Sequence, residues 1–142
     1  MPAKQVEIRT ATPADLPAVA AIQDASPEAA HWPVSDYLSH QFLVATVGDS
    51  VAGFLVSRTV GPGEQEILNL AVSPDFRGKG IGRTLFQAAI REFQGLIFLE
   101  VRESNSTARS FYKSLKFQEV ALRQNYYREP PEAAIVMKFH SC

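Results

Sequence analysis

The sequence predicts one α/β domain organised around a mixed sheet. Short strand-like segments recur along the chain, and helix-like segments with an apolar stripe separate several of them. The expected order is β-α-(α)-β-β-β-α-β-α-β-β, which amounts to about seven strands and about four helices. A length of 142 residues suits one domain of ordinary size, so we expect residues 1–142 to form a single domain.

The composition argues against several classes of protein. Hydrophobic residues make up 46% and charged residues 20%, which is typical of a globular protein with an apolar core. The net charge of −1 argues against a dedicated nucleic-acid-binding protein. No apolar run approaches the ~20 residues of a membrane span, and the N-terminus lacks the apolar stretch of a signal peptide. We therefore expect neither a nucleic-acid partner nor a membrane.

Cysteine and histidine usage carries two further expectations. The only cysteine is Cys142, so no intrachain disulfide can form and a reducing, cytoplasmic location is the simpler expectation. The histidines His31, His40 and His140 are scattered along the sequence and indicate no metal site.

The first half of the chain is expected to hold a strand, a capped helix and a hairpin. Residues 6–10 alternate like a strand. Thr12, Pro13 and Asp15 then have the pattern of a helix start, with Thr12 as the N-cap, and this helix should reach about Ala25. The other expected elements are a short helix at 35–38, hairpin strands at 42–47 and 51–60, and a largely apolar, central strand at 66–72.

The second half alternates helices and strands. The segment 80–93 has the clearest apolar stripe and predicts a helix. A buried strand at 96–101, a second helix at 106–115 and closing strands at 117–122 and 134–139 complete the domain. Asn105 or Ser104 is expected to cap the second of these helices.

A glycine-rich segment joins the central strand to the helix 80–93. Its sequence is Arg77-Gly78-Lys79-Gly80-Ile81-Gly82-Arg83. Glycines let main-chain N–H groups approach a ligand, and a helix N-terminus adds roughly half a positive charge, so the two suit a pyrophosphate. The alternative is a glycine-rich turn without a ligand. The glycine spacing matches neither the P-loop nor the dinucleotide-binding fingerprint.

Three further segments carry side chains that are candidates for catalysis or substrate binding. Glu100 closes an otherwise apolar strand, where it is either a proton acceptor at a cleft or, as the sequence alone favours, an ion-pair partner of Arg102 or another cation. Tyr112 falls one turn after Ala108 on a helix and is either a core residue or a catalyst. Tyr126 and Tyr127, expected in a loop between the last two strands, either line a substrate groove or pack in a hairpin.

The stretch from Asn69 to Gly82 resembles the acyl-CoA motif of the GNAT superfamily of N-acyltransferases. That motif, Gln/Arg-x-x-Gly-x-Gly/Ala, is matched by Arg77, Gly80 and Gly82. The segments 99–105, 111–117 and 123–127 resemble the RimI-type branch, the ribosomal-protein alanine N-acetyltransferases. The resemblance covers about residues 66–138. It implies a mixed, mostly antiparallel sheet and an acyltransferase that uses acetyl-CoA as co-substrate and needs no metal.

The resemblance also implies roles for individual residues. Glu100 would be the general base and Tyr112 the general acid that protonates the leaving thiolate. Tyr126 and Tyr127 would line a peptide groove. The acyl-CoA contacts would come from the main chain of Leu70, Ala71 and Val72 for the pantetheine arm, from Gly78 to Arg83 for the pyrophosphate, and from Asn105 for the pantetheine end.

Two positions depart from this branch on the acceptor side. The branch usually has glycine where Lys116 stands, and a lysine in a left-handed helix stop costs about 1 kcal/mol or forces another ending. The branch also tends to carry Glu-Asp-Ala where this chain has Glu132-Ala133-Ala134, so an acidic contact is missing.

The leading interpretation is an acetyl-CoA-dependent N-acetyltransferase, a monomer or homodimer, that acts on the N-terminal α-amine of a protein or peptide. One alternative is the same chemistry on a small-molecule amine. The other is a non-catalytic acyl-CoA-binding module, which the presence of both Glu100 and Tyr112 disfavours.

Overall fold

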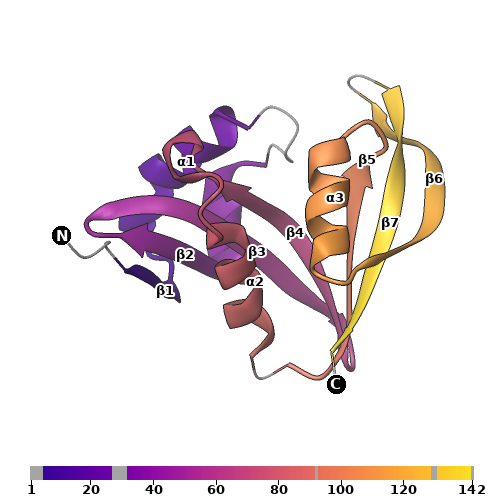
Figure 1. Ribbon diagram of the computed structural model, residues 1–142, viewed down its shortest axis with the longest axis horizontal. Coiled ribbons are helices and arrows are strands. Elements are labelled where there is room, and N and C mark those ends of the chain that lie inside the picture. Colours follow the sequence, from indigo (N-terminus) through magenta and orange to yellow (C-terminus); the bar gives the residue numbers. More distant parts are fainter. Residues whose placement is uncertain (1–4, 27–31, 92, 129–130, 142) are drawn as a thin grey trace. The chain divides into compact units, whose positions relative to one another are not determined.

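The computed structural model describes residues 5–26, 32–91, 93–128 and 131–141, and it has the expected mixed α/β fold (Figure 1). Seven strands form one sheet in the order β1-β2-β3-β4-β5-β7-β6. The recorded pairings are antiparallel except for the parallel pair β4–β5, so the predicted fold class is confirmed. The chain divides into two compact units, residues 1–58 with 67–93 and residues 59–66 with 94–142.

The elements occur in the predicted order along the chain. The described residues form three α-helices, three 3-10 helices and seven strands. The expected short helix at 35–38 is a 3-10 helix, and the helix expected over 80–93 ends at Ile90. The bounds are β1 Val6–Thr10, η1 Pro13–Asp15, α1 Leu16–Asp24, η2 Val34–Ser39, β2 Gln41–Val47, β3 Ser50–Gly61, β4 Glu64–Val72, η3 Pro74–Phe76, α2 Ile81–Ile90, β5 Gly95–Arg102, α3 Ser106–Ser114, β6 Gln118–Arg128 and β7 Pro131–Ser141.

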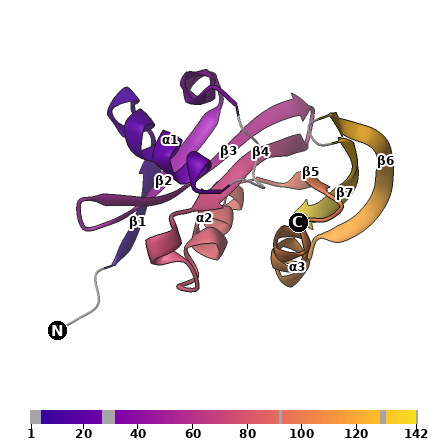
Figure 2. The ribbon, with the colours of Figure 1, turned by 90° about the horizontal axis from the view of Figure 1, so that it is seen from above.

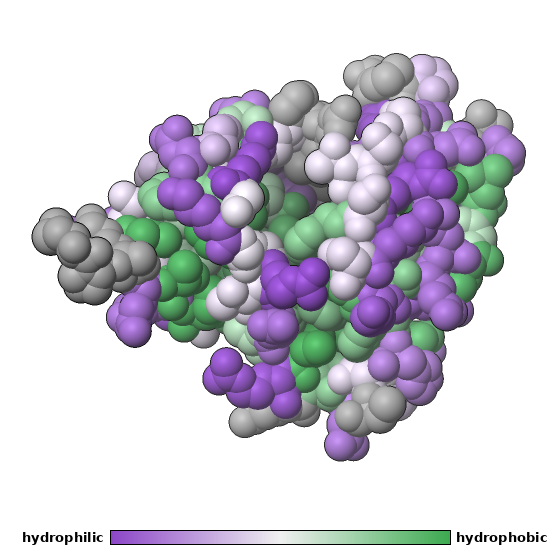
Figure 3. Space-filling model, viewed as in Figure 1, coloured by the Kyte–Doolittle hydropathy of each residue, from purple (hydrophilic) through white to green (hydrophobic). Residues whose placement is uncertain are grey.

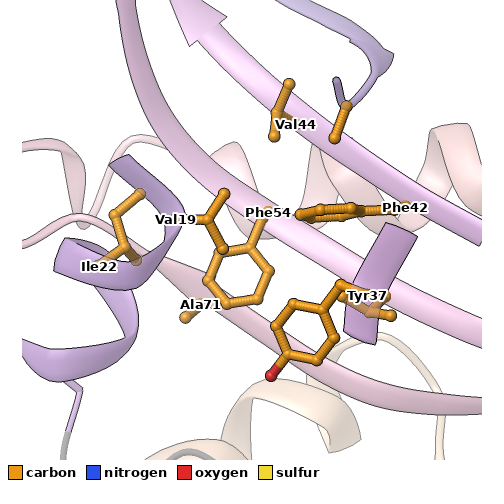
Figure 4. Close-up of a cluster of buried hydrophobic side chains, with 9 residues drawn as sticks. Val19, Ile22, Tyr37, Phe42, Val44, Phe54 and Ala71 are labelled. Carbon is orange, nitrogen blue, oxygen red and sulfur yellow. The ribbon is translucent and has the colours of Figure 1, made fainter. Parts of the chain in front are cut away.

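The core of the first unit lies between its strands and the α1–η2 segment (Figure 4). Phe42 and Val44 of β2 lie opposite Val56 and Phe54 of β3, so alternate residues of both strands point to one face. Tyr37 of η2 contacts Phe42 and Phe54 at ring-centroid distances of 5.6 and 5.8 Å. These side chains bury the apolar face on which α1 rests.

Helix α2 covers the other face of the same strands, as Figure 2 shows. At Gly53, next to Phe54, a Cβ would meet the Ala71 carbonyl oxygen at 2.9 Å and a methyl carbon of Leu85 at 3.3 Å. Leu85 is a fully buried residue of α2. Glycine at position 53 therefore allows β3, β4 and α2 to approach closely.

A buried polar network joins α1, η2 and β4 within the first unit. The Tyr37 hydroxyl donates to Gln23 Oε1 at 2.5 Å, and Asn69 Nδ2 donates to both that oxygen and the Tyr37 hydroxyl at 3.2 and 3.1 Å. Gln23 Nε2 also donates to the Trp32 carbonyl at 2.8 Å. The network ties the main chain at Trp32 to strand β4.

The second unit is built around β5. Its first residues pair in parallel with Glu64–Glu66 of β4, and its whole length pairs antiparallel with β7. The parallel pairing begins where the Leu96 N–H donates to the Gly63 carbonyl at 2.8 Å. Gly95 has φ +141°, and a Cβ there would collide with the same carbonyl oxygen, so only glycine fits this contact.

The start of the first helix follows the predicted capping pattern. Asp15 accepts a hydrogen bond from the Thr12 N–H at 2.8 Å. Arg9 of β1 adds a two-pronged ion pair to the same carboxylate, with both N–O distances at 2.8 Å. The hydrogen bonds from Arg9, and to a lesser extent from Thr12, lower the pKa of Asp15 from 3.8 to about 2.

Because folding lowers this pKa, we expect Asp15 to stabilise the fold above pH 4 and to lose that effect as the pH falls toward 2. Replacing Asp15 by Asn should flatten the dependence of the unfolding free energy on pH in this window. Urea unfolding at several pH values measures the slope, and Arg9→Gln should flatten it in the same way. An unchanged slope in Asp15→Asn would contradict the assignment.

Lys116 ends helix α3 in the left-handed conformation, with φ +80°. Among the described residues it is the one non-glycine residue with positive φ. A left-handed helix end was expected at this position from the family resemblance. The lysine takes up this left-handed conformation, and the helix does not end in another way.

Replacing Lys116 by glycine is therefore expected to stabilise the protein by about 1 kcal/mol, since glycine has no Cβ to strain in this region. Lys116→Ala is the matched control, because alanine loses the charge and keeps the Cβ. Chemical denaturation of the three proteins measures the difference, and an equal gain in both variants would argue against backbone strain as the cause.

Candidate functional site

The first candidate site is the turn between β4 and α2. Gly78 and Gly80 have φ +77° and +79°, and nothing lies within 4 Å of the position of a Cβ at either residue. Gly80 is the N-cap of α2. The glycines therefore allow a backbone conformation that other residues rarely adopt, and they leave open space beside it. A ligand in that space can accept hydrogen bonds from the main-chain N–H groups at the start of α2.

The side chains of this turn divide into two kinds. Ile81 is buried and Gly82 has no side chain, so both would reach a ligand through the main chain. Lys79 and Arg83 add two positive charges, and the Lys79 ammonium lies 5.6 Å from the centre of the Phe76 ring. The turn thus combines main-chain donors with cationic side chains, which is the chemistry that a pyrophosphate needs.

The guanidinium of Arg77 has structural partners. Its Nε donates to the Val72 carbonyl at 3.0 Å, and its Nη2 donates to Ser26 Oγ at 3.0 Å and to the Ala25 carbonyl at 3.4 Å. The side chain therefore ties the turn to the end of β4 and to the C-terminus of α1. A phosphate contact of Arg77 would come from its main chain.

Strand β4 leads into this turn. Its recorded pairing with β5 comprises Glu64–Glu66, whereas Leu70, Ala71 and Val72 belong to the first unit. The expected pairing of these three residues with a pantetheine arm stays a prediction.

The second candidate site lies in the second unit, at Glu100 of β5. The Glu100 side chain is 11% exposed, and its Oε1 accepts a hydrogen bond from Arg123 Nη1 at 2.6 Å. The other oxygen, Oε2, is buried and has no hydrogen-bond partner among the described residues. A buried carboxylate oxygen without a donor is costly, so this atom is a place where the N–H of a ligand or a water would be stabilised.

Tyr126 and Tyr127 lie beside this carboxylate in strand β6. The expectation of a loop was wrong, because β6 continues to Arg128 through an irregular register between Arg123 and Tyr127. The Tyr127 hydroxyl donates to the main-chain carbonyl of Glu100 at 3.4 Å. Burial, and next the nearby Tyr126, raise the pKa of Tyr127 to about 12, so its phenol is a donor at neutral pH.

Two arginines stack on these tyrosine rings. Arg123 lies 4.5 Å from the centre of the Tyr126 ring, and Arg102 lies 4.3 Å from that of Tyr127. Arg102 also pairs with Glu132 at 3.4 Å. The ion pair expected at Glu100 with Arg102 or another cation is therefore present, and its partner is Arg123. Sequence reasoning missed this role of Arg123, since 23 residues separate the partners and no local pattern links them.

Tyr112 lies on the buried face of α3 and is 6% exposed. Its ring contacts Phe111 and Phe117 at centroid distances of 5.1 and 5.4 Å. Burial raises its pKa above the ordinary value of a tyrosine, which keeps the hydroxyl protonated. The side of α3 that faces the viewer in Figure 3 is neutral to hydrophilic. Arg109 and Lys113 of this helix pair with Glu119 at 2.6 and 3.2 Å.

Asn105 caps α3, as predicted, by accepting a hydrogen bond from the Ala108 N–H at 3.0 Å. This bond occupies Oδ1, so a contact with the end of a pantetheine arm would use the Nδ2 amide or the main chain. Such a contact stays a prediction.

Two kinds of feature are absent from the described residues. No group of three or more His, Cys, Asp or Glu side chains is arranged to hold a metal ion in the part of the chain that the structure describes. Within the same residues, no helix is both long and apolar enough to cross a membrane.

The mixed sheet and the glycine turn before α2 are the arrangement expected of an acyltransferase that uses an acyl-CoA, and comparison with known proteins gives the family. Residues 8–117 match the acetyltransferase (GNAT) family, and the chain belongs to this family. It is an N-acetyltransferase of the GNAT fold, and the GNAT family uses acetyl-CoA.

Several relatives of known function are similar over most of the chain. The [ribosomal protein bS18]-alanine N-acetyltransferase of Salmonella typhimurium is 36% identical over 134 residues, which are 87% of this chain and 89% of the relative. The N-alpha-acetyltransferase RimI of Mycobacterium tuberculosis is 33% identical over 70% of this chain and 65% of its own length.

Solved structures agree with this assignment. The ribosomal-protein-S18-alanine N-acetyltransferase of Escherichia coli is 30% identical and has a TM-score of 0.80, covering 97% of this chain and 96% of the other. Ard1 from Thermoplasma volcanium is 31% identical and has a TM-score of 0.87, covering 96% of this chain and 98% of the other.

Proposed function

We propose that this enzyme transfers the acetyl group of acetyl-CoA directly to the N-terminal α-amine of a protein or peptide, with the N-terminus of a ribosomal protein as the first candidate. The observation that carries the proposal is the arrangement at Glu100, where a nearly buried carboxylate with an unpartnered oxygen lies beside Tyr126 and Tyr127. The names of the relatives, which act on the alanine of ribosomal protein bS18, support the same class of acceptor. A cytoplasmic location belongs to the proposal, because ribosomal proteins are made there.

Glu100 is the proposed general base. An α-amine with a pKa near 8 needs about one pKa unit of help to be neutral at pH 7, or ~1.4 kcal/mol, which one carboxylate can supply directly or through a water. A lysine amine with a pKa near 10.4 needs about 3.4 units, or ~4.6 kcal/mol. The single carboxylate therefore suits an α-amine better than a lysine.

Tyr112 is the proposed general acid. Acetyl-CoA supplies the acetyl group as a thioester, whose departing sulfur carries negative charge. The Tyr112 hydroxyl is protonated at neutral pH, as an ordinary phenol is, and burial raises its pKa further, so it has a proton to donate to that sulfur. In a direct transfer the proton of the amine goes to Glu100, and no covalent enzyme intermediate is formed.

The turn between β4 and α2 is the proposed holder of the pyrophosphate. The open space around Gly78 and Gly80 fits the approach of an anion to the main chain. Lys79 and Arg83 would add charge to this cradle. Leu70, Ala71 and Val72 would pair with the pantetheine arm through their main chain, and Asn105 would contact its end.

The test compares two peptides of one sequence in an assay of thiol release from acetyl-CoA. One peptide has a free N-terminal alanine and no lysine, and the other has a blocked N-terminus and one internal lysine. We expect turnover on the first peptide alone. Turnover on small amines only would favour a small-molecule acetyltransferase. Acetyl-CoA binding without turnover on any amine would favour a non-catalytic module.

A further inference from the structure

The ion pair with Arg123 blocks the access of other groups to the Glu100 carboxylate. Arg123 Nη1 occupies Oε1 at 2.6 Å, and Oε2 is buried. The other charged and titratable groups near the carboxylate and its two tyrosines are Tyr126, Tyr127, Arg102, Glu66 and Glu132. Arg102 and Glu132 are paired with each other. When an acceptor amine approaches, the accessible oxygen of Glu100, Oε1, is therefore already bound to Arg123 of the same chain.

The two members of this pair differ in burial. The Arg123 side chain is 54% exposed and the Glu100 side chain is 11% exposed. Arg123 lies on β6, the outermost strand of the sheet order, just before an irregular stretch of its pairing with β7. A guanidinium in this position can leave at little cost, because water replaces its hydrogen bonds.

Glu100 does not have the same freedom. A carboxylate that is almost buried is strongly destabilised when it loses its counter-charge. Arg123 is therefore expected to leave Oε1 only when another cation arrives. An alkyl ammonium group suits this exchange, because it brings three N–H donors, and its charge can lie against the Tyr126 ring as the guanidinium does.

We propose that Arg123 is a place-holder for the acceptor, whose ammonium group displaces the Arg123 guanidinium from Glu100. The inference rests on the proposed function, in which Glu100 is the base. It makes Arg123 a specificity-determining residue. A free primary ammonium exchanges with it, whereas an N-terminus that is already acylated carries no charge to exchange and leaves the carboxylate closed. In this scheme Arg123 also competes with every acceptor, so it weakens acceptor binding.

The first test does not depend on activity. Arg123→Ala should leave a site that binds a small ammonium ion, for which ethylammonium chloride is the probe. Its melting temperature should rise with ethylammonium chloride relative to sodium chloride at equal ionic strength, and the rise should saturate. The unmodified protein should respond only at higher ethylammonium concentrations, because the guanidinium must first be displaced, and a Glu100→Gln/Arg123→Ala variant should not respond at all. The same response in all three proteins, or none in Arg123→Ala, would overturn the exchange. Should the alanine variant not fold, Arg123→Gln takes its place.

The second test uses acceptor kinetics. Arg123→Gln should lower the KM for the N-terminal alanine peptide by about two- to fivefold, the range expected for the loss of an exposed ion pair. The KM for acetyl-CoA should not change, and Arg123→Lys should restore the higher peptide KM. Arg91→Gln is the charge-matched control, because it removes one exposed cation at the end of α2, in the first unit.

An unchanged or higher peptide KM in an active Arg123→Gln variant would show that Arg123 does not compete with the acceptor. Absence of turnover in the unmodified protein on every amine would instead count against the proposed function. The melting experiment would then test the displacement of Arg123 without any turnover. A failure of this proposal can therefore be distinguished from a failure of the proposed function.

Discussion

Acetyl transfer is expected to fall by at least about 10²-fold when Glu100 is replaced by Gln and Tyr112 by Phe in one variant, since general acid–base groups typically contribute 10²–10⁴-fold each. Acetyl-CoA binding should persist, because the proposed pyrophosphate turn is not altered. Thiol release measures the turnover, and isothermal titration with acetyl-CoA measures the binding.

Each half of this double variant is conservative in shape. Glu100→Gln keeps an oxygen that can accept from Arg123, and Tyr112→Phe keeps the ring contacts with Phe111 and Phe117. The lost activity would therefore report on a carboxylate and a hydroxyl, rather than on packing. Glu103→Gln is the matched control, because it neutralises an exposed carboxylate just beyond β5. Undiminished turnover in the double variant would show that neither residue has the assigned role.

The second large effect is expected in the core of the first unit. Replacing Phe54 by Ala should lower the unfolding free energy by about 3–5 kcal/mol, the usual cost of removing a large buried aromatic side chain. Phe54 is fully buried, and its ring lies 5.8 Å from that of Tyr37 and 6.3 Å from that of Phe42. Urea unfolding measures the loss.

Phe54→Leu separates the cavity from the contacts at this position. Leucine fills more of the volume than alanine does, so its cost should be clearly smaller. Equal losses in the two variants would mean that the aromatic contacts of Phe54, rather than its volume, hold this core together.

Features that depend on neighbours in the sequence could be predicted. The cap formed by Thr12, Pro13 and Asp15, and the cap of α3 by Asn105, involve side chains three residues from the groups that they bind. The strands at 42–47 and 51–60 could be recognised because the turn between them is short and contains glycine. The left-handed conformation at Lys116 was predicted from the family resemblance and is present in the structure.

Features that depend on distant partners could not be predicted. Arg77 binds the end of α1 across about 51 positions of the sequence, and its motif alone pointed to a phosphate. Arg123 and Glu100 meet because β5 and β6 both pair with β7. The continuation of β6 through Tyr126 and Tyr127 was hidden, because an irregular strand breaks the alternation by which strands are recognised.

The network of Gln23, Tyr37 and Asn69 has a consequence for how this sequence can change over time. Each side chain satisfies a polar atom of another, so losing one leaves a buried group without its partner, whereas replacing all three with apolar residues of similar shape need not be costly. The three positions should therefore vary together among homologues, and single changes should be rare. Gln23 also donates to the Trp32 carbonyl, so a homologue without this triad would lose the hydrogen bond that fixes the main chain at Trp32.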